Sequence, residues 1–517
     1  MSKVFVGWAE QSLVPMKKVS LHGQFYERIS EYVESEITAT AMAVEANGEE
    51  MIMVSCDLTY IPAYLMELVR KRFSELCSEV DVSKIILAAT HTHTSHTFAP
   101  TSECKIRGDV DMPLNELQSR DILAEFMPSE KEYKALVTAD DTVIKPEEAT
   151  DFVSRRIAKA CVDAWNSRKP AMIANEFGRA VVGMCRRVSY DDGTAKMWGD
   201  TNSANFTALE GGNDSGIELL YIFDTDKKLT GIVANIACPS QILEQRSFIS
   251  ADYWGRAKAI IREKLGSDIF LLGLGGAGGD QCPRDLIRWV QPETPIDDPN
   301  VIRKFPLKHK ADPSMYDISG CNKVGKRIAN EIISVYEDMD SEAISGDVSF
   351  KHKVVSLDLP LRKVTDTEYN NAIREIEYFV QKNADKPMFD YADNANMYIN
   401  AGAIHRYRQQ QFTEIFNIEY HAIRLGNIAF VTNPFELFLD YGNRIKARSY
   451  AAQTFIVQLS CGVAGYLPTE KAERAGHYSA YVTSGYVGHE GGDLLVREQL
   501  KDIGEMFEGE EIYDKIW

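Results

Sequence analysis

Six apolar segments spread along the chain each end at a polar or reactive residue. This pattern constrains the fold more than any other feature, because the carboxyl ends of strands build the ligand crevice of an open α/β sheet. Together these residues supply imidazole, carboxylate, thiol and phenol groups, which suit a metal site and its acid–base partners. They are Asp57, His91, Cys238, Asp280, Glu436 and Tyr466. The pattern predicts an α/β protein with a site at its strand ends.

The N-terminal part of the chain has the order strand, helix, strand. Residues 36–45 and 51–56 are apolar and β-like, and Asn47-Gly48 between them is a hairpin signal. A helix is predicted to start near Pro62, and residues 84–89 form the next apolar run. This order predicts a parallel strand pair with a helical crossover. We therefore expect mixed β-sheets flanked by helices.

Three of the ten histidines follow the run at 84–89, in the segment Thr90-His91-Thr92-His93-Thr94-Ser95-His96. If the extended backbone continues past the strand, His91 and His93 point to the same side. Neutral imidazole is a common ligand of zinc-like metals, and histidine also titrates near neutral pH. The segment predicts metal or acid–base chemistry. The alternative is a polar surface loop, which we expect for His96.

Composition argues against nucleic-acid binding and against a membrane-spanning segment. The chain has 517 residues and a formal net charge of −19, whereas nucleic-acid binding needs clustered Lys and Arg. No apolar run approaches the roughly 20 residues that a membrane span needs. There is no secretory signal, and the nine cysteines include no CxxC pair. We expect a cytoplasmic protein with free thiols and a small-molecule substrate, and the sequence leaves its oligomeric state open.

No shift in composition marks a linker, so residues 1–517 are predicted to form one large domain. Residues 101–145 are polar and acidic, which predicts either an insertion or lid over the site or a passive surface excursion. Residues 384–400 are also polar and rich in turn residues. The glycine-rich run at 273–279 lacks the lysine of a phosphate-binding loop and does not match GxGxxG at the start of a helix, which argues against nucleotide binding.

Five short motifs occur in a definite order along the chain. They are Ser55-Cys56-Asp57-Leu58, Thr90-His91-Thr92-His93, Gly279-Asp280-Gln281-Cys282-Pro283, Pro434-Phe435-Glu436 and Gly465-Tyr466-Leu467-Pro468-Thr469. In this order they resemble motifs of the neutral/alkaline (non-lysosomal) ceramidases. The resemblance implies the catalytic domain of that family without its C-terminal immunoglobulin-like domain, and a zinc-dependent hydrolase that cleaves an amide bond.

In that family, two histidines, a glutamate and a tyrosine hold the zinc ion. By motif, the resemblance assigns His91, Glu436 and Tyr466 to three of these positions. Cys238 occupies the position of the second histidine. One interpretation is that Cys238 binds the zinc, since thiolate is a good zinc ligand. The other is that Cys238 is a buried thiol, and that the metal is lost or is held by His93, Gln241 or Glu244 instead.

The resemblance also suggests which residues perform the reaction. His93 is the candidate general base or partner of a metal ligand, and Arg186 and Tyr466 are candidates to stabilise developing negative charge. Asp280 and Cys282 belong to the motif that contacts the reacting group. Cys282 replaces a serine, and it forms a hydrogen bond, acts as a thiolate nucleophile or is a small residue in a tight turn. The candidate substrate-binding residues are Asp57, Gly279, Arg187, Tyr486 and His489.

The sequence therefore predicts a metal-dependent hydrolase that uses a zinc-activated water to cleave an amide-type bond of a soluble substrate. The bond type comes from the resemblance alone. Two alternatives stay open. One is a hydrolase or lyase that acts on a carbohydrate, and the other is a protein that binds a ligand without turnover and has lost the metal.

Overall fold

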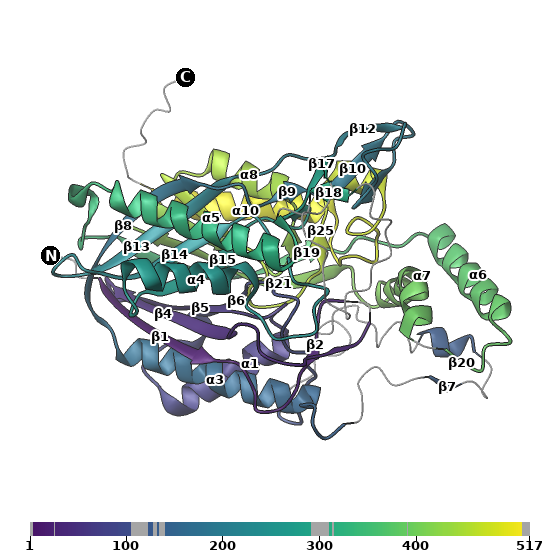
Figure 1. Cartoon of the computed structure of the whole chain (residues 1–517), viewed down its shortest axis with the longest axis horizontal. Coiled ribbons are helices and arrows are strands. Elements are labelled where there is room, and N and C mark those ends of the chain that lie inside the picture. The colour runs from purple at the N-terminus through teal and green to yellow at the C-terminus, as the bar shows by residue number, and fades with distance from the viewer. Residues whose placement is uncertain are drawn as a thin grey trace.

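Two β-sheets face each other at the centre of the computed structural model (Figure 1), which describes residues 4–24, 26–104, 122–127, 132–133, 140–290, 310–312, 315–389 and 391–508. The main sheet has eight strands in the order β15-β14-β13-β8-β1-β4-β5-β6, and the second sheet has four in the order β19-β21-β22-β24. Side chains of both sheets meet in one buried apolar cluster, which includes Met53, Leu272, Phe430 and Phe455. The two sheets are therefore packed face to face.

The main sheet consists of β1 (Phe5–Ser12), β4 (Thr38–Ala46), β5 (Glu49–Cys56), β6 (Ile85–Ala89), β8 (Lys169–Arg179), β13 (Gly216–Asp224), β14 (Leu229–Ile236) and β15 (Phe270–Gly275). The second sheet consists of β19 (Phe350–Pro360), β21 (Ile415–Leu425), β22 (Ile428–Thr432) and β24 (Gln453–Val457). The pairs β5–β6, β14–β15 and β22–β24 are parallel, and the other neighbours in the two sheets are antiparallel. Both sheets are mixed, which confirms the predicted fold class.

Helices cover the outer face of each sheet (Figure 1). On the main sheet, α1 (Ala63–Leu76) and α3 (Pro146–Asn166) pack over β4, β5 and β6, while α4 (Asp252–Leu265) and α5 (Asp317–Glu337) pack over β13 and β14. On the second sheet lie α8 (Leu439–Arg448) and α10 (His489–Met506). The result is a sequence of four layers: helices, sheet, sheet, helices.

The alternation of side chains in β4 explains this layering. Ala39, Ala41 and Ala43 pack against α1 and α3, whereas Met42 and Val44 point to the second sheet. Because both faces of the strand are buried, its sequence is an almost continuous apolar run with no polar face. The small alanines on one face let the helices approach the sheet closely.

The predicted hairpin and crossover are confirmed. Asn47 and Gly48 have φ of 55° and 78°, the positive values that a two-residue hairpin turn requires. The helix α1 then connects β5 to β6, which run parallel. Both features follow from local sequence. A turn dipeptide joins two apolar runs into the hairpin, and the helix after it is long enough to return the chain for a parallel strand.

The polar stretch at 384–400 is more regular than its composition suggests. α7 (Tyr391–Gln409) begins within it and packs on α6 (Asp366–Lys382) through Ala401 and Ile404. Most of the predicted insertion at 101–145 lies outside the described residues. None of the helices in the described part of the chain is both long and apolar enough to span a membrane.

Candidate active site

Five predicted residues meet beyond the strand ends and form what we call the His91 cluster: His91, His93, Arg186, Glu436 and Tyr466. The short strands β23 (Glu436–Leu437) and β25 (Tyr466–Leu467) pair in parallel and place Glu436 directly beside Tyr466. His91 Nε2 lies 3.5 Å from Glu436 Oε2. Arg186 Nη2 donates to the Tyr466 hydroxyl at 3.3 Å. Residues from distant parts of the sequence therefore share one site.

His91 does not continue the strand. β6 ends at Ala89, and His91 has a φ of 67°, a left-handed conformation that is uncommon for a residue other than glycine. The extended backbone, the condition under which His91 and His93 would point to the same side, therefore does not continue through His91. The two rings nevertheless meet, because His93 Nε2 lies 3.3 Å from His91 Nε2.

The hydrogen bonds of His91 determine what its ring presents to Glu436. Nδ1 lies 2.7 Å from the Thr59 carbonyl oxygen, which can only accept, so Nδ1 carries a hydrogen. In the neutral ring, Nε2 then directs a lone pair at the Glu436 carboxylate. A positive charge, either a proton or a metal ion, has to lie between these two groups for the contact to be favourable.

A second carboxylate lies on the far side of His93. Glu244 Oε2 is 3.6 Å from His93 Nδ1, and the Tyr316 hydroxyl donates to Glu244 Oε1 at 2.8 Å. His93 is held from behind by Gly23, whose φ is 107° and where an added Cβ would lie 2.5 Å from the His93 ring. Glu244, His93, His91 and Glu436 thus form a continuous chain of polar groups.

The pKa values of the two carboxylates are pushed in opposite directions. Burial raises the pKa of Glu244, and the hydrogen bond from Tyr316 opposes this only in part. Burial also acts to raise the pKa of Glu436, but His91 and Arg186 outweigh it, so that the pKa lies below its usual range. Burial lowers the pKa of His93 well below its usual value. At neutral pH, Glu436 is therefore ionised, and Glu244 holds a proton more readily than an ordinary glutamate.

Arg186 is fixed by backbone contacts on one side only. Its Nη2 donates to the Gly279 carbonyl at 2.9 Å, and its backbone N–H donates to the Asp280 carbonyl at 2.9 Å. Its Nε is buried and makes no hydrogen bond. Gly279, a predicted substrate-binding residue, lies against Glu436, since an added Cβ would lie 2.3 Å from the Glu436 carbonyl oxygen.

Cys238 does not join the predicted metal ligands. It is fully buried in the apolar cluster between β14 and α4, and its thiol points to the Pro239 carbonyl oxygen at 3.6 Å. Among the described residues, the ligand atoms of His91, Cys238 and Glu436 are not all within 4.8 Å of one another. The geometry therefore supports the second interpretation, in which Cys238 is a buried thiol.

Cys282 and Asp280 also have structural partners. The Cys282 thiol donates to the Arg284 carbonyl at 3.3 Å, and burial raises its pKa to about 12, which disfavours a thiolate nucleophile. This geometry fits a small residue in a tight turn. Asp280 Oδ1 accepts from the Leu439 N–H at 2.9 Å at the start of α8, and burial raises its pKa to about 6. Neither side chain contacts the imidazoles in any described interaction.

The remaining four predicted substrate-binding residues are Asp57, Arg187, Tyr486 and His489, and each is engaged within the protein. Asp57 is fully buried and accepts from Lys258 and from the Thr38 N–H. The N–H groups of Arg187 are all used, by Glu210, by the Ser479 hydroxyl and by backbone carbonyls of residues 472, 476 and 478. Tyr486 stacks on Phe416 in the core, and His489 pairs with Glu473. No free donor of Arg187 is left for a substrate.

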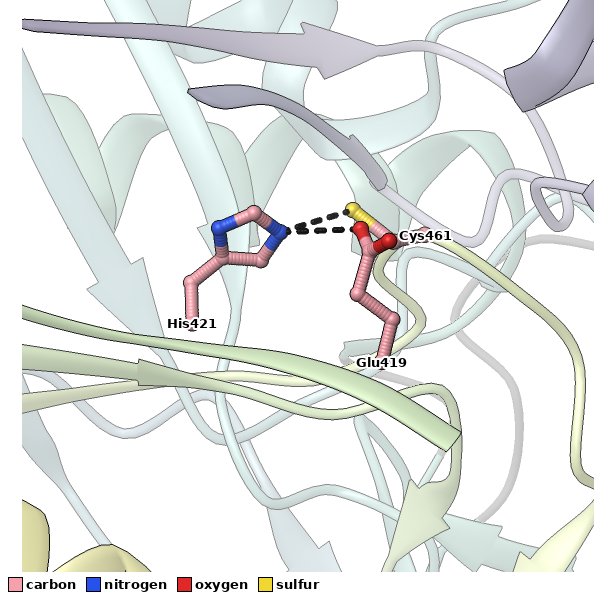
Figure 2. Close-up of side chains that lie close together, drawn as sticks. All are labelled: Glu419, His421 and Cys461. Atoms are coloured by element: carbon pink, nitrogen blue, oxygen red, sulfur yellow. Dashed lines mark hydrogen bonds and ion pairs between the residues drawn. The ribbon is translucent and has the colours of Figure 1, made fainter. Parts of the chain in front are cut away.

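A second group of possible metal ligands consists of Glu419, His421 and Cys461, which we call the His421 cluster (Figure 2). Among the residues that the structure describes, it is the group of three His, Cys, Asp or Glu whose ligand atoms all lie within 4.8 Å of one another. Burial acts to raise the pKa of Glu419, but hydrogen bonds from His421 and Arg70 lower it to about 2. The sequence analysis did not identify this cluster, because Cys461 lies far along the chain from the other two residues.

Similarity to solved structures concerns the whole fold. The chain superposes on the crystal structure of neutral ceramidase from Pseudomonas aeruginosa with a TM-score of 0.64, covering 98% of this chain and 75% of that one. The chain has the fold of neutral ceramidase. The sequence identity over this match is 13%. A ceramidase complexed with C2 gives a TM-score of 0.63 at 12% identity, covering 97% of this chain and 75% of that one.

The similarity to ceramidase lies in the fold and in short motifs, and it does not extend to the sequence as a whole. No protein-family model matches the sequence, and neither does any curated protein. The resemblance noted in the sequence is confirmed for the fold. The match to 75% of the ceramidase chain agrees with a likeness to its catalytic domain alone.

Proposed function

We propose that this protein is a hydrolase that cleaves an amide-type bond of a small substrate at the His91 cluster. One observation carries the proposal: His91 Nε2 faces the ionised carboxylate of Glu436 at 3.5 Å, with the Arg186 guanidinium and the Tyr466 phenol beside them. Such a concentration of buried polar groups is costly for stability and is typical of a reaction site. The ceramidase fold supports the choice of an amide-type bond.

A zinc-like ion fits the donor set that His91, Glu436 and Tyr466 provide. Three protein donors that leave one position open are typical of catalytic zinc sites. The Thr59 carbonyl holds His91 in the tautomer that a metal ligand needs, which is the usual arrangement around such a histidine. When bound, the ion would lower the pKa of a water molecule and polarise a carbonyl group. Cys238 has no part in this set.

Arg186 is suited to stabilise negative charge on the substrate. It remains charged at all relevant pH values, and its buried Nε–H has no hydrogen-bond partner. A carbonyl oxygen that gains charge during hydrolysis would satisfy this donor, so the interaction strengthens in the transition state. Arg186 Nη2 also donates to the Tyr466 hydroxyl, so the guanidinium lies next to one of the proposed zinc donors.

His93 and Glu244 are suited to move protons. Glu244 holds its proton more readily than an ordinary glutamate, and its Oε2 lies 3.6 Å from His93 Nδ1. His93 Nε2 is in turn 3.3 Å from His91 Nε2, next to the reacting group. We assign this pair the role of supplying a proton to the nitrogen of the scissile bond. Amide hydrolysis needs this proton, because an unprotonated nitrogen would have to leave as an anion, which is a poor leaving group.

The two carboxylates also favour a second candidate function. Glycoside hydrolases use one ionised carboxylate and one protonated carboxylic acid, and Glu436 and Glu244 have pKa values displaced in these two directions. A hydrolase acting on a carbohydrate is therefore the alternative to the amide hydrolase.

The test is to incubate zinc-loaded protein with a panel of short N-acyl amines and N-acyl amino acids and with a panel of oligosaccharides. Glu436→Gln serves as the control, because it removes the charge but keeps the size of the side chain. Cleavage of the N-acyl compounds by the wild type only supports the proposal. Cleavage of oligosaccharides alone supports the second candidate. No cleavage in either panel, with equal zinc content in the wild type and in Glu436→Gln, would contradict both.

A further inference from the structure

The His421 cluster shares no residue with the His91 cluster and joins parts of both sheets. Glu419 and His421 are two residues apart on β21, so their side chains lie on the same face of that strand. Cys461 follows β24, and its backbone N–H donates to the Leu87 carbonyl of β6 at 3.0 Å. We propose that Glu419, His421 and Cys461 form a second metal site, which binds a zinc-like divalent ion and links the second sheet to the edge of the main sheet.

The distances agree with ligands arranged around one ion. His421 Nε2 lies 3.1 Å from Glu419 Oε1 and 3.6 Å from Cys461 Sγ, and Figure 2 shows that both contacts are made by the same ring nitrogen. With a Zn–N distance of about 2.0 Å and a Zn–S distance of about 2.3 Å, two ligands of a tetrahedral ion lie about 3.4 to 3.6 Å apart. The site therefore needs only small side-chain movements to bind an ion.

A chain of hydrogen bonds fixes the tautomer of His421. The Glu50 carbonyl oxygen accepts from His352 Nδ1 at 2.9 Å, so in a neutral His352 ring Nε2 is an acceptor. His352 Nε2 lies 2.9 Å from His421 Nδ1, which must then be the donor. This leaves His421 Nε2 with a lone pair directed at the oxygen of the half-buried Glu419 carboxylate, a repulsive contact unless a cation lies between them.

The surroundings of the cluster match those of metal sites. His352 bonds to the ring nitrogen of His421 that would not bind the ion, as the outer partners of metal-bound histidines do. Arg70 donates to both oxygens of Glu419, at 2.9 and 2.6 Å, which fixes the carboxylate and leaves a further lone pair on Oε1 toward His421. The two charges of the ion would be balanced by Glu419 and by Cys461 as thiolate.

The ligand types indicate the class of metal. A thiolate and an imidazole favour zinc or cobalt over magnesium and calcium, which prefer oxygen ligands. The same three residues are not arranged as a nucleophile with its base and orienting acid. In that arrangement the acid bonds to the ring nitrogen opposite the nucleophile, whereas here Glu419 and Cys461 both face His421 Nε2. The cluster therefore does not have the geometry of a nucleophilic triad. With three protein donors, an ion bound here would need a fourth ligand such as water to complete a tetrahedron.

The test is to titrate the metal-free full-length protein with cobalt(II) and to record the thiolate-to-cobalt charge-transfer band in the near ultraviolet. We expect the band in the wild type, its loss in Cys461→Ser, and its retention in Cys238→Ser. Cys238 is the control, since it is the buried cysteine that the sequence placed among the possible metal ligands and that lies outside the His421 cluster. No band in the wild type, or a band that Cys461→Ser leaves unchanged, would overturn the proposal.

Two further measurements keep the test decisive if Cys461→Ser does not fold. In Glu436→Gln, which is expected to lose the ion of the His91 cluster, zinc should still raise the Tm by a few degrees, and His421→Gln in the same background should abolish this shift. X-ray absorption at the zinc edge of Glu436→Gln should show one sulfur neighbour. A zinc environment of nitrogen and oxygen alone, or no zinc-dependent shift in Tm, would contradict the proposal.

Discussion

The His91 cluster and the His421 cluster each contain a histidine and a glutamate, and an arginine adjoins each of them. In each, a histidine bonds through Nδ1 to the protein, its Nε2 faces a glutamate, and an arginine lies near that glutamate. They differ in how the arginine is used. Arg70 binds both oxygens of Glu419, whereas Arg186 stays 3.9 Å from Glu436 and donates to the Tyr466 hydroxyl instead. The Nε–H of both arginines is buried without a hydrogen-bond partner. An arginine that binds both oxygens of a carboxylate fixes that group in place, whereas an arginine held away from the carboxylate can interact with a substrate.

The second difference lies behind the two histidines. His93 and Glu244 adjoin His91 and form a route along which a proton can move. Behind His421 lies His352, whose Nδ1 donates to the Glu50 carbonyl oxygen, so the chain of hydrogen bonds ends there. A carbonyl oxygen neither gives nor takes a proton at neutral pH. Two similar histidine–carboxylate pairs can therefore differ in chemical role, because the groups that surround them differ.

Glu436→Gln is expected to have the largest effect on activity. The change removes the negative charge beside His91, so kcat/KM on a cleaved substrate should fall by about 1,000-fold, with an unchanged circular dichroism spectrum. Glu419→Gln is the matched change in the His421 cluster and should cost far less activity. Equal losses in the two variants would remove the distinction between the clusters.

Arg186→Met and Arg70→Met should separate activity from stability. We expect Arg186→Met to lower kcat/KM by about 100-fold, as the loss of a donor to a developing oxyanion does. Arg70→Met should instead lower the free energy of unfolding by about 2 kcal/mol, because it leaves the carboxylate of Glu419 without its main partner. Kinetics and urea unfolding of both variants measure the two effects. The reverse assignment of the losses would show that the unused donor of Arg186 is unimportant.

Glu244→Gln should change the pH profile of the reaction. Burial raises the pKa of Glu244, so the protonated acid persists to higher pH than in an ordinary glutamate and is lost as the pH rises through the raised value. The wild type should therefore lose kcat/KM on the alkaline side of this pKa. The variant should lack this limb and have a maximum lower by about 10-fold or more.

Glu473→Gln is the control for that measurement, because Glu473 pairs with His489 outside the His91 cluster. It should keep the alkaline limb of the wild type. An unchanged profile in Glu244→Gln would show that the proton comes from another group.

Asp280→Asn is expected to have the smallest effect on activity, and its main effect is on the pH dependence of stability. The folded pKa of Asp280 is about 6, above the unfolded value of about 3.9, so the protonated acid stabilises the fold below about pH 4 and this contribution is lost as the pH rises to 6. Asparagine does not titrate but keeps an acceptor for the Leu439 N–H. The stability of the variant relative to the wild type should therefore rise by on the order of 2 kcal/mol between about pH 4 and pH 7.

Urea unfolding at several pH values measures this difference, and a difference independent of pH would be inconsistent with the raised pKa. Activity should fall much less than in Glu436→Gln. A loss of activity as large as in Glu436→Gln would support the catalytic role that the sequence predicted for Asp280.

The parts of the fold that the sequence predicts well are those set by local patterns. The hairpin at Asn47-Gly48 and the crossover through α1 each depend on neighbours in the sequence. The meeting of His91, Glu436 and Tyr466 was expected only from the ordered motifs of a known family, because nothing in their spacing indicates that β23 pairs with β25.

The parts that the sequence does not predict depend on partners far along the chain. Asp57 follows a strand, as a ligand-binding residue would, but its charge is neutralised by Lys258 of α4. Arg186 and Arg187 are adjacent, and only the fold shows that one lies at the His91 cluster while the other is buried against Glu210. The sequence named Glu244 only as a possible replacement metal ligand, and its contacts with His93 and Tyr316 are seen only in the fold.

The buried Arg187 has a consequence for the lifetime of the site. Its guanidinium binds the carbonyls of residues 472, 476 and 478, and the side chain of the last of these, Tyr478, packs edge to face against Tyr466. Because Arg187 directly follows Arg186, opening of the segment 472–479 would release the guanidinium of one residue and loosen the position of the other. Amide hydrogen exchange in this segment should therefore report the fraction of molecules with an intact site, even in the absence of a known substrate.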